Sequence, residues 1–76
     1  MTCPIFMKDV RDIERVNEVA TQTTIDMYVQ FGTRTIDPRS LLGLFTFMGK
    51  DALLVAPDDT DPKHFLYIIK KMSVAR

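Results

Sequence analysis

The spacing of apolar residues changes from a helical period to a strand period partway along this 76-residue chain, and this change limits its possible folds most strongly. After Asp9, apolar residues recur every three or four positions among charged ones, as in a helix with one buried face. They are Val10, Ile13, Val16 and Ala20. Between Ile25 and Phe31, apolar residues instead alternate with polar ones, as in a half-buried strand. The two patterns together predict a fold that mixes helices and strands.

Two further strands are predicted, one after the strand at Ile25–Phe31 and one before the first helix. The dipeptide Gly32-Thr33 is a turn signal, and Arg34–Ile36 follows it as a short returning strand, which predicts a hairpin. Pro38 cannot donate to a strand ladder and ends the pairing. The first segment, Cys3–Met7, is apolar, and its proline at position 4 suits an edge strand. Because this edge strand is short, the sequence leaves open the pairing of two copies.

A short apolar helix follows the hairpin. Ser40 has the side chain of a helix N-cap, and Leu41–Phe45 supplies one or two helical turns. Gly43 weakens this helix by about 1 kcal/mol relative to alanine. Ser40 therefore lies at the junction between an extended segment and a helix.

The C-terminal third contains one more strand and one more helix. Ala52–Ala56 is a compact apolar strand that Pro57 ends. Asp61 is an N-cap and Pro62 occupies the first helical position, where its missing N–H is not needed. The buried face of this helix consists of Phe65, Ile68, Ile69 and Met72. The complete order, β-α-β-β-α-β-α in one domain of residues 1–76, predicts an antiparallel four-stranded sheet with three helices on one face.

Charge and cysteine content exclude several classes of function. Ten lysines and arginines balance ten acidic residues, so no net field attracts nucleic acid or an anionic membrane. No apolar run approaches the roughly 20 residues of a membrane span. Cys3 is the only cysteine, which excludes an intrachain disulfide and favours a reducing cytoplasmic location. We expect neither a cofactor nor a metal ion, because Asp58, Asp59 and Asp61 fit a solvated turn better than a calcium loop.

The stretch "TIDPRSLLGLFTF" (Thr35–Phe47) resembles the second motif of the HPr phosphocarrier family, "V-(D/N)-x-K-S-(I/L)-(M/L)-G-(L/V)". Arg39 replaces the usual lysine, and Ser40 and Gly43 fall on the serine and glycine of the motif. The similarity extends over roughly Ile25–Met72. It implies an open-faced sandwich of four antiparallel strands and three helices, and a relation to the bacterial sugar phosphotransferase system.

The first motif of that family, "G-(I/L)-H-x-R-P", is missing. Members carry a phosphoryl group on its histidine, at the start of the first helix, whereas the corresponding stretch here reads "FMKDVRDIERV". Asp9 falls near the histidine position and Arg11 near the arginine. The resemblance therefore predicts a divergent member that does not transfer phosphate through histidine and is not an enzyme.

Three residues are candidates for phosphate chemistry. In some bacteria a kinase phosphorylates the serine of the second motif, so the resemblance makes Ser40 a possible regulatory phosphosite, with Arg39 or Arg34 to pair with the phosphate. Asp9 could accept a phosphoryl group, although its position also suits an N-cap. The single histidine, His64, is the only imidazole available for phosphate carriage but is expected to be an ordinary helix residue.

The resemblance also predicts a surface for a protein partner on the first and second helices. The residues expected to form it are Arg11, Arg15, Leu41, Leu44 and Phe45. Our first hypothesis is thus a non-catalytic regulatory or interaction domain with the HPr fold. The alternatives are a phosphocarrier that uses Asp9 or another acceptor, and an unrelated small α+β binding module with the same element order, which a sheet connectivity unlike the family's would favour.

Overall fold

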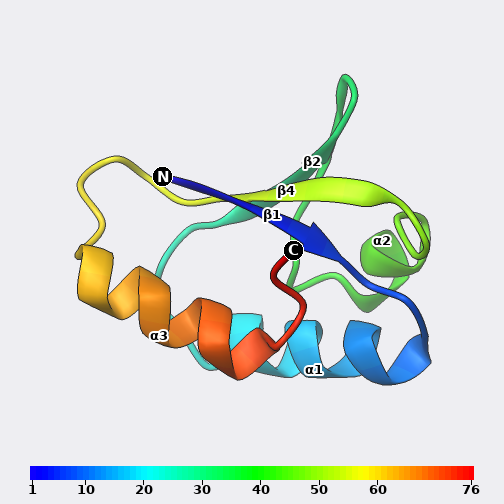
Figure 1. Cartoon of the computed structure of the whole chain (residues 1–76), viewed down its shortest axis with the longest axis horizontal. Helices are drawn as coiled ribbons and strands as arrows, with labels where there is room; N and C mark the ends of the chain where they lie inside the picture. The colour runs from blue at the N-terminus through cyan, green and yellow to red at the C-terminus, as the bar shows by residue number, and fades with distance from the viewer.

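The computed structural model describes all residues, 1–76, and contains four strands and three helices. The strands are β1 (Thr2–Phe6), β2 (Tyr28–Phe31), β3 (Arg34–Ile36) and β4 (Asp51–Val55). The helices are α1 (Val10–Thr21), α2 (Leu41–Phe45) and α3 (Pro62–Met72). Figure 1 shows the sheet on one side of the molecule and the helices on the other. The predicted element order and the antiparallel α+β class are confirmed.

The strands form one antiparallel sheet in the order β1-β4-β2-β3. Residue pairs such as Ile5 with Ala52 and Val29 with Leu54 align β4 between β1 and β2. β1 is an edge strand, as Pro4 predicted. After α3 the chain returns to this edge, where Ala75 forms an isolated antiparallel bridge with Ile5.

The core lies between the sheet and the helices. Buried residues alternate along β4, where Ala52 and Leu54 point inward and their neighbours point outward. Sixteen buried apolar residues form one cluster. Its fully buried members include Ile5, Met7, Ile13, Val16, Ala20, Val29, Leu44, Phe47 and Leu54. Four residues of α1 were predicted to face the core, and all of them except Val10 are buried.

Each helix begins at the predicted cap. The Asp9 carboxylate accepts a hydrogen bond from the backbone N–H of Asp12 (3.0 Å), and the Ser40 hydroxyl accepts one from Gly43 (3.2 Å). Asp61 caps α3 by accepting from the N–H of Lys63 at 2.9 Å. These bonds satisfy N–H groups that a helix cannot pair internally.

Three predicted strands have wrong bounds. The first and last were predicted as Cys3–Met7 and Ala52–Ala56 but each begin and end one residue earlier, at Thr2–Phe6 and Asp51–Val55. The second strand begins at Tyr28 and not at Ile25, although Met27 is buried as the alternation predicted. The backbone carbonyls of Thr23 and Ile25 accept hydrogen bonds from the Arg39 side chain, so this segment folds around a guanidinium group. A tertiary contact therefore replaces the strand pairing that the alternation favoured.

Candidate functional site

The start of α1 is the stretch that the family resemblance led us to compare with the histidine motif, and its acidic side chains are engaged in local hydrogen bonds. Asp9 is the N-cap. Asp12 is buried, and its carboxylate accepts hydrogen bonds from the Lys8 backbone N–H (2.9 Å) and from Arg15 Nη2 (2.6 Å). Burial by itself raises the pKa of Asp12, but the Lys8 N–H, the Arg15 guanidinium and the Lys8 charge together hold that pKa below its usual value.

Arg15 connects this site to the end of α3. Its Nε donates to the Met72 carbonyl at 2.7 Å, and its Nη2 lies 3.4 Å from the Ser73 carbonyl. Arginine near a helix C-terminus also interacts favourably with the exposed carbonyls there. Arg15, predicted as part of a partner surface, thus has bonding partners within the fold.

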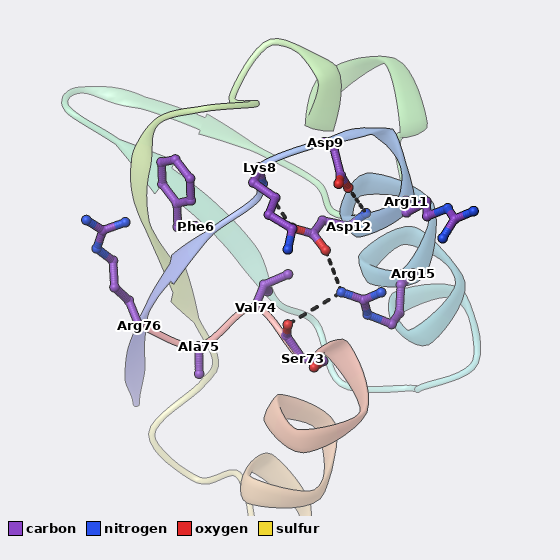
Figure 2. Close-up of a pocket in the computed structure, with 10 residues that line it drawn as sticks. All are labelled: Phe6, Lys8, Asp9, Arg11, Asp12, Arg15, Ser73, Val74, Ala75 and Arg76. Carbon is purple, nitrogen blue, oxygen red and sulfur yellow. Dashed lines mark hydrogen bonds and ion pairs between the residues drawn. The ribbon is translucent and has the colours of Figure 1, made fainter.

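These residues line a cavity of about 570 Å³ between the start of α1 and the C-terminal segment (Figure 2). Its lining residues are Phe6, Lys8, Asp9, Arg11, Asp12, Arg15, Ser73, Val74, Ala75 and Arg76. Arg76 pairs with Asp51 at 3.1 Å and lies over the Phe6 ring. The ammonium group of Lys8 and the guanidinium group of Arg11 make no hydrogen bond or ion pair, and Figure 2 shows Arg11 pointing away from the cavity. Neither Lys8 nor Arg76 was predicted, because no local pattern marks them.

Arg39 has a structural role that its place in the motif did not reveal. Its guanidinium donates to the carbonyls of Ala20 (3.3 Å), Thr23 (3.1 Å) and Ile25 (3.0 Å). It also lies 3.5 Å from the exposed carboxylate of Asp26. Arg39 therefore closes the C-terminal end of α1, and four of its five N–H donors are already used.

Ser40 is exposed beside this residue, and its hydroxyl caps α2. Arg34, the other arginine considered as a phosphate partner, lies 5.3 Å from the centre of the Phe47 ring. Its Nη2 is 3.5 Å from the hydroxyl of Thr46. Asn17 of α1 donates to the Arg39 carbonyl at 2.9 Å and so holds the start of α2 against α1.

Four apolar side chains of α2 and the turn after it are exposed. They are Leu41, Leu42, Phe45 and Met48, called here the α2 patch. Leu42 is the most exposed of them, at 81 %. Leu44 was predicted to belong to the partner surface, but it is fully buried in the core and cannot contribute to it. A helix of five residues does not show from its sequence which leucines face inward, and this ambiguity concealed Leu42 and Met48.

Gly43 leaves room for the N-cap of its own helix. A Cβ atom at this position would lie 3.2 Å from Oγ of Ser40, a tight contact, and 3.4 Å from Cβ of Ile36, an ordinary van der Waals distance. A side chain at position 43 would therefore crowd the Ser40 cap.

The remaining candidates lie elsewhere. His64 is exposed on α3, beside residues at the C-terminal end of α1, and not near the start of α1. Asp58 pairs with the N-terminal ammonium group at 3.2 Å.

None of the helices has the length and apolar character needed to cross a membrane.

Sequence comparison finds no match among protein-family models or among curated proteins. Solved structures do match. HPr-C-His from Thermoanaerobacter tengcongensis superposes with a TM-score of 0.70 and 15 % identity, over 95 % of this chain and 88 % of that one. The histidine-containing phosphocarrier protein of Mycoplasma gives a TM-score of 0.70 and 12 % identity, over 95 % and 90 %. These matches exclude a sheet connectivity unlike that of the family, which would have favoured an unrelated binding module. The chain therefore has the fold of the HPr phosphocarrier proteins.

Proposed function

We propose that this chain is a non-catalytic, HPr-like interaction domain related to the sugar phosphotransferase system. The observation that supports this proposal is the α2 patch, an exposed apolar surface on a small domain that could bury these residues only against a partner. The side chain of Val10, at the start of α1, is also exposed and adds apolar area to the surface of the first helix. Arg11, which makes no hydrogen bond or ion pair within the fold, is proposed to supply a positive charge to the same partner surface.

The absence of a histidine at the start of α1 supports a role without phosphotransfer. Imidazole suits phosphate carriage because its pKa lies near neutrality. Asp9 stands near that position, but its carboxylate caps the helix. A phosphoryl group on Asp9 would compete with this cap, which stabilises helices by about 1 kcal/mol.

Ser40 is the proposed regulatory site of the same surface. A phosphate there would add about −1.5 to −2 charges immediately before Leu41 and Leu42. Because Arg39 is bonded to backbone carbonyls, the new charge would remain beside apolar side chains. Phosphorylation of Ser40 is therefore proposed to weaken binding at the α2 patch.

The general enzyme of the phosphotransferase system provides the test. We would titrate the ¹⁵N-labelled chain with that enzyme, with and without phosphoenolpyruvate, and follow amide shifts and intact mass. The proposal expects shifts at the α2 patch and no gain of mass. It also expects Leu42→Asp and a phosphomimetic Ser40→Asp to weaken binding, while Leu66→Asp on α3 does not.

Two outcomes would contradict this proposal. A hydroxylamine-sensitive phosphoryl group on Asp9 would instead establish the altered phosphocarrier. Shifts that leave the α2 patch unchanged would show that this patch is not the docking surface. Arg11→Glu is the appropriate charge reversal in these experiments, because reversal of Arg15 would also break its bonds to Asp12 and Met72.

A further inference from the structure

β3 forms an unpaired edge of the sheet, on the side away from both ends of the chain. In the strand order β1-β4-β2-β3 it has β2 on one side and no neighbour on the other. Both chain ends lie at the opposite side of the sheet, where Met1 bonds to Ala56 after β4, and Ala75 bridges to Ile5 of β1. In Figure 1 the tip of the β2–β3 hairpin projects away from the helices and from both termini. The chain ends therefore leave the β3 edge open.

This edge has backbone groups without a partner. The hairpin turn has two residues, so Phe31 and Arg34 form its closing hydrogen-bonded pair. Successive residues of an antiparallel strand direct their backbone groups to opposite neighbours. Thr35 therefore points its N–H and C=O away from β2, as do the N–H of Asp37 and the C=O of Thr33. No bond from another segment of the chain reaches these four groups.

The two ends of the edge carry opposite charge. Arg34 and Lys50 lie at the hairpin end, each over a phenylalanine ring, and neither forms an ion pair. Asp26 and Asp37 lie at the other end and are exposed. Arg39 lies there too and pairs with Asp26 at 3.5 Å, so Asp37 has no ion pair. Two cations thus stand at one end, and two carboxylates with a single guanidinium at the other.

The helix α2 lies along the inner face of this edge. A Cβ atom on Gly43 would touch Ile36, and Nη2 of Arg34 is 3.5 Å from the hydroxyl of Thr46. Leu42 stands four positions before Thr46 and shares its stripe of the helix. Leu42 is 81 % exposed and Ile36 is half-buried. A strand added to β3 would therefore gain apolar contacts beneath its backbone bonds.

We propose that two copies of this chain associate through their β3 edges, as antiparallel strands about a two-fold axis at Thr35. Thr35 would exchange two hydrogen bonds with the partner's Thr35, and each Asp37 N–H would donate to the partner's Thr33 carbonyl. The axis reverses the order of charges, so the end with Arg34 and Lys50 meets the acidic end of the other copy. A second copy supplies this complementary order by symmetry, whereas an unrelated peptide would need a matching sequence.

The dimer is expected to be weak. A three-residue strand and one leucine per copy bury less area than the roughly 1,200 Å² at which stable interfaces begin. The dissociation constant should therefore lie at about 0.1–1 mM. Sedimentation equilibrium and amide shifts of the whole chain, from about 20 µM to 1 mM, cover this range. We expect a rise toward twice the monomer mass, shifts at residues 33–37, and slower exchange of the Thr35 amide.

A proline variant tests the backbone contact. Thr35→Pro removes an N–H that has no partner within the fold, and edge strands tolerate proline at such positions. It should weaken association roughly ten- to hundredfold, because the dimer loses two hydrogen bonds, and change the urea midpoint little. Thr2→Pro is the matched control on the β1 edge. Its N–H also points outward, since the Pro4 carbonyl bonds outward to Arg76, and association should not change.

A pair of charge variants tests the register. Arg34→Glu places two acidic groups together in its own dimer, and Asp37→Lys places two basic groups together, so each variant alone should associate less than wild type. In an equal mixture Glu meets Lys at one end and Arg34 meets Asp37 at the other, so association should return. Asp37→Lys also loses a bond to the Arg39 N–H, but a fold defect would not be repaired by mixing.

The proposal is overturned if the chain stays monomeric at 1 mM, if the dimer survives Thr35→Pro, or if the mixture associates no better than each charge variant alone. A dimer that Thr2→Pro dissociates would instead assign the contact to β1. None of these variants alters the α2 patch, and the measurements use the chain without any other protein. Failure of the dimer would therefore leave the proposed function to its own test.

Discussion

The buried carboxylate of Asp12 is the most informative single position for the stability of this fold. It bonds to the Lys8 N–H and to the Arg15 guanidinium, and Arg15 in turn holds the end of α3. A hydrogen bond to a charged group contributes about 1.5–3 kcal/mol net. Asp12→Asn retains one acceptor oxygen but loses the charge, so we expect it to lower the free energy of unfolding by about 2 kcal/mol. Asp12→Ala removes both bonds and should cost about 3–4 kcal/mol.

These losses are large for a chain of this length, whose total stability is roughly 4–11 kcal/mol. Urea unfolding followed by circular dichroism at pH 7 would measure them. With a slope of about 1 kcal/mol per molar urea, Asp12→Asn should lower the midpoint by about 2 M. The matched control is Asp59→Asn, an exposed carboxylate without a hydrogen bond, whose midpoint should not change.

The pH dependence provides a second, independent test. The pKa of Asp12 is lower in the folded protein than its ordinary value, so the unfolded chain binds its proton more readily. The stabilisation is therefore complete above the ordinary carboxyl pKa and disappears as pH falls through the folded pKa. The difference between wild type and Asp12→Asn should shrink accordingly. The reasoning is refuted if the two proteins have equal midpoints at pH 7, or if their difference persists unchanged at pH 2.5.

Three further predictions concern other parts of the fold. Arg39→Met should lower the free energy of unfolding by about 1–3 kcal/mol and accelerate amide exchange in residues 22–27, because three carbonyls lose their donor; unchanged exchange there would contradict this role. Leu44→Ala should cost about 2–5 kcal/mol in urea unfolding, whereas Leu42→Ala should change stability by less than about 0.5 kcal/mol, and equal effects would disprove the assigned orientation of α2. Burial raises the pKa of the Cys3 thiol, so iodoacetamide at pH 8 should alkylate it more slowly than free cysteine; a rate equal to that of the urea-unfolded chain would show that the thiol is not shielded.

Much of the fold could be predicted from local patterns. The caps Asp9, Ser40 and Asp61 marked all three helix starts, because an N-cap satisfies its own helix and needs no distant partner. Pro4 predicted the edge position of β1 for a similar reason, since a missing N–H affects only the strand that contains it. The similarity of Thr35–Phe47 to a family motif added the expectation of an open-faced sandwich of four antiparallel strands and three helices.

The candidate site was less predictable than the fold. The sequence marked Arg39 as a phosphate partner, but three carbonyls from the end of α1 and the following loop converge on its guanidinium. Arg15 was assigned to a surface, yet it bonds to Met72 at the other end of the chain. In both cases the partners are backbone oxygens, which carry no side-chain signature in a sequence.

The sequence by itself determined the order and approximate positions of the helices and strands, that the sheet is antiparallel, and that no histidine stands at the start of α1. These properties depend on hydrophobic period, on caps and on residue identity, all of which are local. Only the tertiary structure decided which leucines of α2 are exposed, which arginines are free, and how much of the β1 edge is covered. Those properties depend on contacts between segments far apart in the chain, such as Arg15 with Met72 and Ile5 with Ala75.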